Sequence, residues 1–188
     1  MKGLRAAFQQ RCLNFVLDRL RCIDETGMNL TLTRLYGRAA PGVRVVDTVP
    51  QNYGENITLL AALSFQGLSA PMIVEGAVDA EVFRVYIQEV LGPTLRPGDI
   101  VLMDNLAVHK VAGIAEALRA RGARVEYLPP YSPDLNPIEK CWAKIKTALR
   151  HAKARTREVL EKVLKQALQT ISAADARAWF AHCGYPVH

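Results

Sequence analysis

Hydrophobic and polar residues follow two different periods along this chain. The segment ITLLAALSF, 57–65, is apolar almost throughout, as in a strand covered on both faces, and APMIVEG, 70–76, follows as its hairpin partner. From Asp79 onward the apolar residues recur at helical spacing until Gly92 and Pro93. This change of period predicts a strand hairpin followed by a helix that Asp79 caps.

The rest of the chain alternates between strand and helix patterns. LRCID, 20–24, is a short apolar run that stops at the turn-like ETG, and LTLTRLYG, 30–37, is rich in β-branched residues. Further strands are expected at 99–105 and 123–130, and helices at 108–122, 137–150 and 156–171. The order predicts a mixed α/β domain with helices on both faces of a central sheet.

Composition supports one globular domain. The chain has 188 residues, of which 50% are hydrophobic and 22% are charged, which is enough to bury a sizeable core. We expect a single domain over 1–188, with a helical arm at 1–18 and a helical extension at 151–188. No apolar run approaches the roughly 20 residues of a membrane span, and no secretory signal is evident, so a cytoplasmic protein without a membrane partner is expected.

Two aspartates each follow a strand pattern. Asp104 ends the strand IVLMD, and in open α/β sheets ligands bind at the carboxyl ends of strands. Asp24 ends LRCID in the same way, whereas strand alternation directs Glu25 to the opposite face. Each aspartate has a simpler interpretation as a turn residue, so neither establishes a site alone.

Glu139 follows a loop stiffened by four prolines, in LPPYSPDLNPIEKCW, 128–142. The simpler interpretation is a capping box, with Asn136 as N-cap, Pro137 at the first helical position and Glu139 reaching back to the N-cap amide. Capping does not explain the rigid loop, because prolines restrict the chain far upstream of the cap. The loop therefore predicts that the start of this helix is held at a defined position.

Two aspartates and a glutamate match the requirements of two-metal phosphoryl chemistry. Mg²⁺ prefers oxygen ligands, and two such ions can activate an attacking hydroxyl and stabilise the leaving oxygen. The expected cofactor is therefore a pair of Mg²⁺ ions, with Mn²⁺ as a substitute.

Positive charge is concentrated near the C-terminus. The net charge is +6, and nine Lys/Arg against two Glu lie between Lys140 and Lys165. Four basic residues fall at i, i+4, i+7 and i+11, one face of a helix continued from Glu139, and could follow a phosphate backbone. A solvated helix face is the simpler alternative. The candidate DNA contacts are these four residues, Lys146, Arg150, Lys153 and Arg157, together with Lys110 and Lys144.

Three strings in the chain resemble a known family. CIDETG, VLMDNLAVHK and LPPYSPDLNPIEKCWAKIK, at 22–27, 101–110 and 128–146, resemble the DDE transposases of bacterial insertion sequences in the mariner superfamily (insertion-sequence 630 type). Asp104 and Glu139 are separated by 34 residues, the spacing of that group. The resemblance is close from about Leu20 to Arg150.

The resemblance implies an RNase H-like fold with Asp24, Asp104 and Glu139 as the catalytic, metal-binding triad. It implies Mg²⁺-dependent cleavage of transposon ends and attack of the new 3′-hydroxyl on target DNA. Asn105 and His109 match the family's D-N-x-x-x-H pattern and are expected near the site, without an assigned chemical step.

Members of this family usually carry N-terminal helix-turn-helix modules, which 23 residues before Asp24 cannot hold. The chain is therefore expected to be a catalytic half that needs a separate DNA-reading module, acts on nucleoid DNA and works as a homodimer. Two alternatives stay open. One is a decayed or non-catalytic DNA-binding remnant, and the other is an RNase H-like nuclease without strand transfer.

Overall fold

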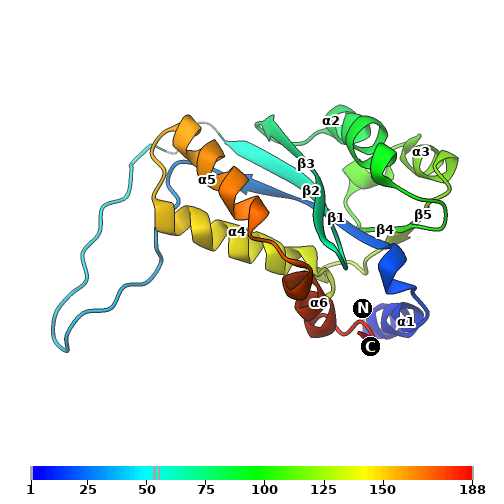
Figure 1. Cartoon of the computed structure of the whole chain (residues 1–188), viewed down its shortest axis with the longest axis horizontal. Coiled ribbons are helices and arrows are strands. Elements are labelled where there is room, and N and C mark those ends of the chain that lie inside the picture. Colours follow the sequence, from blue (N-terminus) through cyan, green and yellow to red (C-terminus); the bar gives the residue numbers. More distant parts are fainter. Residues whose placement is uncertain (1, 53, 55, 188) are drawn as a thin grey trace.

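A computed structural model describes residues 2–52, 54 and 56–187 of the chain (Figure 1). Five strands form one sheet in the order β3-β2-β1-β4-β5. Strands β1, β2 and β3 pair antiparallel, whereas β1, β4 and β5 pair parallel. The strands are β1 (Leu20–Met28), β2 (Ile57–Ser64), β3 (Gly67–Glu75), β4 (Ile100–Met103) and β5 (Arg124–Tyr127).

Helices cover both faces of this sheet, as the sequence predicts (Figure 1). On one face the core contains Leu20, Cys22 and Met28 of β1 together with side chains of α1, α4, α5 and α6. On the other face Ile23 packs with α2, α3 and the π-helical turn at Tyr86–Leu91. The helices are α1 (Lys2–Cys12), α2 (Ala80–Val85), α3 (Ile114–Ala120), α4 (Ile138–Ala152), α5 (Arg157–Gln169) and α6 (Ala173–His182).

The strand expected at 30–37 is wrong. β1 instead continues through the expected turn ETG to Met28, because Thr26 and Met28 pair with Leu59 and Ile57 of β2. The residues that follow form a long loop that projects from the body of the molecule (Figure 1). Leu35 and Tyr36 are 68% and 90% exposed, so these apolar residues have no sheet to join.

The helix expected at 108–122 is also shorter than predicted. A 3-10 turn at Ala107–Lys110 comes first, and α3 begins only at Ile114. Gly113 separates them with φ at 94°, a left-handed conformation that glycine adopts without a steric penalty. His109 lies in the 3-10 turn and is fully buried.

The two ends of the chain pack beside the proline-rich loop. Arg5 of α1 donates to Ser132 Oγ at 2.8 Å and to Asp134 Oδ1 at 3.0 Å. Tyr185, which follows α6, is buried and donates from its hydroxyl to the Leu135 carbonyl at 2.9 Å. Terminal segments therefore fix the loop that precedes α4.

The four cysteines are buried free thiols. None of the helices in the described ranges is long and apolar enough to cross a membrane.

Candidate active site

Three carboxylates from separate elements line one cavity. Asp24 lies in β1, Asp104 directly follows β4, and Glu139 lies in the first turn of α4. The cavity has a volume of about 350 Å³. Its lining also includes Asn105, Leu106, Asn136 and the segment 128–133.

Strand register explains why the two aspartates meet. Cys22 of β1 pairs with Leu102 of β4, and both side chains belong to the core on the α4 face. Side chains alternate along a strand, so Asp24 and Asp104, each two residues further on, face α4 as well. Asp104 follows its strand as the sequence pattern predicts, whereas Asp24 lies within β1 instead of at its end. The helix after the proline-rich loop supplies the third carboxylate.

Burial and like charge disfavour ionisation of Asp24. Removal from water, followed by the nearby Glu139 and Glu25 carboxylates, raises the pKa of Asp24 to about 8. Burial also raises the pKa of Glu139, and Asp104 adds to this, although Lys146 opposes it. A divalent cation would remove this repulsion.

His109 connects Asp104 to Glu25. Its Nδ1 lies 2.6 Å from Asp104 Oδ1, and its Nε2 lies 3.3 Å from Glu25 Oε2. The ring is fully buried and stacks on Phe83 with 4.3 Å between centroids. The family pattern placed His109 near the site, but nothing in the sequence spacing predicted its contact with Glu25.

These contacts set opposite pKa shifts. Burial lowers the pKa of His109, but the Asp104 and Glu25 carboxylates outweigh it and raise this pKa to about 9. Burial alone would raise the pKa of Asp104. Hydrogen bonds from His109 and from the Leu106 amide outweigh burial and hold this pKa below the ordinary value. Asp104 is thus ionised while Asp24 resists ionisation, which separates the two carboxylates chemically.

The capping-box interpretation of Glu139 is wrong. Pro137 occupies the N-cap position, no side chain caps the helix, and the Asn136 amide instead donates to the Pro133 carbonyl at 2.9 Å. The Glu139 carboxylate is therefore available to the cavity. Asn136 is 2% exposed, and its Oδ1 has no hydrogen-bond partner among the described residues.

Tyr131 marks the rim of the cavity. It lines the cavity, is 90% exposed and has a φ of 54°. A non-glycine residue in this left-handed region is strained, and such strain concentrates at functional sites. The proline-rich loop therefore holds an exposed aromatic ring beside the carboxylates.

The four basic residues predicted to lie on one helix face do not do so, which corrects the prediction. α4 ends at Ala152, because Lys153 adopts a left-handed conformation with φ at 48° and α5 begins only at Arg157. The charge of Lys146 acts to lower the pKa of Glu139. Arg150 lines a second cavity with Arg34 and Arg38 of the projecting loop.

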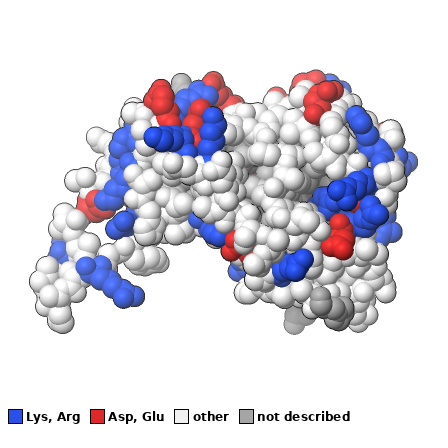
Figure 2. Space-filling view, in the orientation of Figure 1, with Lys and Arg blue, Asp and Glu red and all other residues white. Residues whose placement is uncertain are grey.

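The other basic candidates contact groups of the protein itself. Lys144 bonds Asp175 at 2.7 Å and the Thr170 carbonyl at 3.0 Å. Lys153 bonds Asp47 at 2.6 Å, Arg157 pairs with Glu161 and Glu75, and Lys110 lies over the Tyr127 ring at 5.5 Å. Figure 2 shows Lys and Arg gathered with acidic residues over α5 and again at the end of the molecule near β4, β5 and α1.

The carboxylates fit a hard divalent cation in the type and number of their oxygen donors. They do not converge on a single point: no three acidic, His or Cys side chains in the described part of the chain are grouped closely enough to hold a metal. Mutual repulsion of unneutralised carboxylates favours this separation. Binding would thus draw Asp24, Asp104 and Glu139 together.

Comparison with known proteins adds a family and a fold. Residues 19–161 match the family model described as the DDE superfamily endonuclease. A Mos1 transposase in a paired-end complex with the left transposon end is 20% identical with a TM-score of 0.75. The match covers 97% of this chain and 57% of that one, so this chain spans little more than half of its length.

The catalytic domain of Mos1 mariner transposase is 16% identical with a TM-score of 0.64, covering 97% of this chain and 84% of that chain. Other Mos1 paired-end complexes were solved with Mn or Mg. No curated protein matches the chain in sequence. These likenesses show the RNase H-like fold that the sequence predicts.

Proposed function

We propose that this chain, which belongs to the DDE superfamily of endonucleases, is the metal-dependent catalytic domain of a DNA transposase of the bacterial insertion-sequence 630 type. One observation carries the proposal. Asp24, Asp104 and Glu139, from β1, β4 and α4, line one cavity, and like-charge repulsion with burial raises the pKa of Asp24.

Asp24, Asp104 and Glu139 would hold two divalent ions, Mg²⁺ or Mn²⁺ in its place. When bound, the ions supply activation of a water or hydroxyl nucleophile and stabilisation of the leaving oxygen. The reaction is cleavage of a phosphodiester at a transposon end, followed by attack of the freed 3′-hydroxyl on target DNA.

The chain's own residues position these groups. His109 orients Asp104 through the 2.6 Å contact and shields it from Asp24 by carrying positive charge. The proline-rich loop, fixed by Arg5 and Tyr185, holds the start of α4 and with it Glu139. The Asn105 amide lies in the cavity lining, where it can bond a phosphate oxygen.

DNA is the proposed partner, as transposon ends and as target. Tyr131 supplies an exposed ring on which a base can stack, and Lys146 and Arg150 lie on α4 behind Glu139. The Mos1 complexes contain transposon-end DNA, and the chain spans 57% of that Mos1 chain. The DNA in those complexes supports DNA as the partner, and the proposal further includes a homodimer that works with a separate helix-turn-helix module.

The test is nicking of supercoiled plasmid by the purified chain with Mg²⁺, Mn²⁺ or EDTA, beside Asp104→Asn. A pre-cut end carrying a free 3′-hydroxyl is assayed in parallel for joining to plasmid. Metal-dependent nicking and joining, both lost in Asp104→Asn, are expected. Nicking without joining would establish a nuclease without strand transfer, and neither reaction together with no Mn²⁺ binding would establish a decayed remnant.

A further inference from the structure

A polar hollow, separate from the two cavities described above, lies at the opposite end of the strands that carry the aspartates. Its volume is about 530 Å³. Three arginines line it: Arg19 before β1, Arg21 in β1 and Arg96 in the turn before β4. The remaining lining residues are Val16, Asp18, Ser64, Gln66, Ser69 and Thr94. Arg21 shares its face of β1 with Ile23, so this hollow lies away from the carboxylate cavity.

The side chains of two of these arginines lie close to a buried aspartate. Asp99 is fully buried, and its Oδ2 lies 3.3 Å from Arg21 Nη2 and accepts from the Arg96 amide at 3.0 Å. Arg19 Nη1 lies 3.8 Å from Asp99 Oδ1. Arg21 also donates to the Asp18 and Leu20 carbonyls, so it is held rigidly within the fold. Asp99 and Arg21 therefore neutralise each other.

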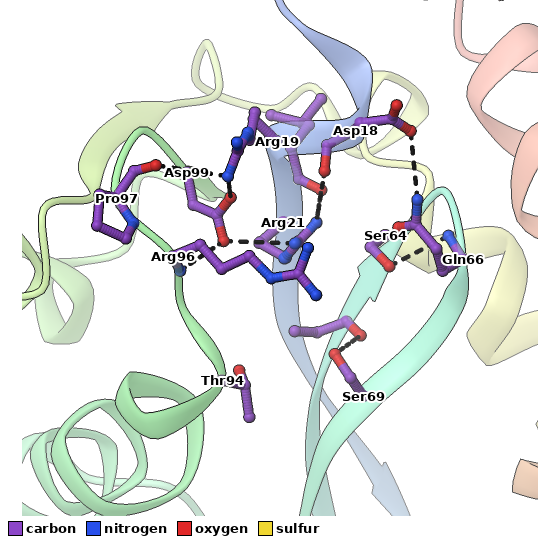
Figure 3. Close-up of polar contacts among 12 residues, drawn as sticks. Asp18, Arg19, Arg21, Ser64, Gln66, Ser69, Thr94, Arg96, Pro97 and Asp99 are labelled. Atoms are coloured by element: carbon purple, nitrogen blue, oxygen red, sulfur yellow. Dashed lines mark hydrogen bonds and ion pairs between the residues drawn. The ribbon is translucent and has the colours of Figure 1, made fainter.

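The positive charge of Arg96 has no such counterpart. Its guanidinium makes no ion pair or hydrogen bond with the described residues; only its backbone bonds Asp99, through the amide that donates to the carboxylate and the carbonyl that accepts from the Asp99 amide at 3.0 Å. Figure 3 shows the Arg96 side chain directed away from Asp99 and toward Arg21. Because Asp18 and Asp99 are the acidic groups in this cluster, three arginines face two aspartates, and a net positive charge is left over the hollow.

The neutral groups of the hollow decide which ligand fits. The hydroxyls of Ser64, Ser69 and Thr94 already donate to the carbonyls of Gly67, Ala62 and Leu91. The amide of Gln66 donates to Asp18 at 3.2 Å and keeps a second N–H. The free donors are thus chiefly the fork of a guanidinium, which matches the oxygens of a phosphate group.

We propose that this hollow is a phosphate-binding site, with Arg96 as the principal donor and Arg19 and Gln66 as secondary ones. Arg21 is a positioning residue because it fixes the wall of the site. The phosphate belongs to a nucleic-acid backbone or to a free phosphate ion, which offer the same oxygens. Binding here requires no metal and no cleavage, so its failure would leave the proposed catalytic activity untouched.

The test uses Arg96→Gln, which removes the charge without disturbing Asp99, because the contact of Asp99 is with the Arg96 backbone. Arg121→Gln is the matched control, since Arg121 is exposed, lies beside Gly92 near this end and does not line the hollow. Binding of a short duplex of mixed sequence is followed by anisotropy in EDTA over a range of salt. Separately, inorganic phosphate is titrated into labelled protein while amide resonances of Gln66 and Ser69 are followed.

Loss of one phosphate contact should weaken duplex binding severalfold and reduce the slope of log K against log salt by about 0.9 in Arg96→Gln but not in Arg121→Gln. That result assigns the site to a DNA backbone. Resonance shifts with inorganic phosphate that vanish in Arg96→Gln, with an unchanged duplex slope, assign it to a free phosphate. Equal salt slopes in both variants, with no resonance shifts, would overturn the proposal.

Discussion

Buried charges are arranged in opposite ways in two regions along β1 and β4. At the amino ends of β1 and β4, fully buried Asp99 lies 3.3 Å from Arg21. Further along, Asp24 in the middle of β1 and Asp104 after the carboxyl end of β4 line a cavity with Glu139. Burial with the neighbouring carboxylates raises the pKa of Asp24 to about 8. A buried charge with a partner is tolerated in a fold, whereas a group of like charges left together destabilises it unless a ligand is bound.

The largest effect is expected at the carboxylate end. Asp24→Asn and Glu139→Gln should each lower metal-dependent nicking by about 10³-fold, because a lost metal ligand removes several kcal/mol of transition-state stabilisation. Circular dichroism should be unchanged, and the free energy of unfolding in EDTA should not fall, since each substitution removes repulsion. Nicking at the wild-type rate by either variant would exclude that residue from the site.

At the arginine end, Arg21→Met should affect stability instead of catalysis. The side chains of Arg21 and Asp99 are 10% and 0% exposed, and removing one partner of a buried ion pair costs about 3–5 kcal/mol. Urea unfolding measures this loss, and Arg96→Gln is the control, expected within about 0.5 kcal/mol of the parent protein. A stability loss equally small in Arg21→Met would mean that Asp99 is not held by this pair.

The raised pKa of Asp24 predicts that the stability of the metal-free protein depends on pH. The folded pKa of Asp24 is raised to about 8, so the metal-free folded state binds more protons than the unfolded state above about pH 4. Stability from this group is complete at low pH and is lost as pH rises through about 8. His109, with its pKa raised to about 9, acts in the same direction at higher pH.

Melting temperatures measured in EDTA should therefore fall from weakly acid to alkaline pH, and Mg²⁺ should reverse much of the fall. Asp24→Asn should flatten the profile at its lower end. A profile that rises with pH in EDTA would contradict the assignment of Asp24 as a carboxylate that resists ionisation.

The smallest expected effect concerns Tyr131, for which two substitutions separate strain from contact. Tyr131→Ala and Tyr131→Gly both remove the ring, so both should lose about 1–3 kcal/mol of DNA binding, the range for base stacking. Glycine also relieves the left-handed strain of about 1 kcal/mol, offset in part by its larger entropy in the unfolded chain. Tyr131→Gly should be the more stable variant in urea. Unchanged DNA binding in both would exclude stacking.

The strand patterns predicted β2, β3, β4 and β5 and the start of β1, although not its end. Apolar runs and period alone identified β2, β3, β4 and β5, and the register of β1 beside β4 brings Asp24 and Asp104 together. The strand at 30–37 failed because local β-propensity does not reveal whether a partner strand is available. The start of β2 is instead paired with β1, which extends to Met28.

Two features of the site lay beyond the sequence pattern. The spacing of Asn136, Pro137 and Glu139 suits a capping box, but the Asn136 amide bonds the Pro133 carbonyl instead, which spacing cannot reveal. The contact between His109 and Glu25 joins residues of separate elements across 3.3 Å. Tertiary packing decided both.

Calorimetric titration of Mn²⁺ into the purified chain tests the central claim most directly, because it needs neither DNA nor turnover. Asp104→Asn is compared with Asp18→Asn, which removes an exposed aspartate at the arginine end. Mn²⁺ is expected to bind the parent protein and Asp18→Asn, and its binding is expected to be lost in Asp104→Asn. Equal Mn²⁺ binding by all three proteins would contradict a metal site formed by Asp24, Asp104 and Glu139.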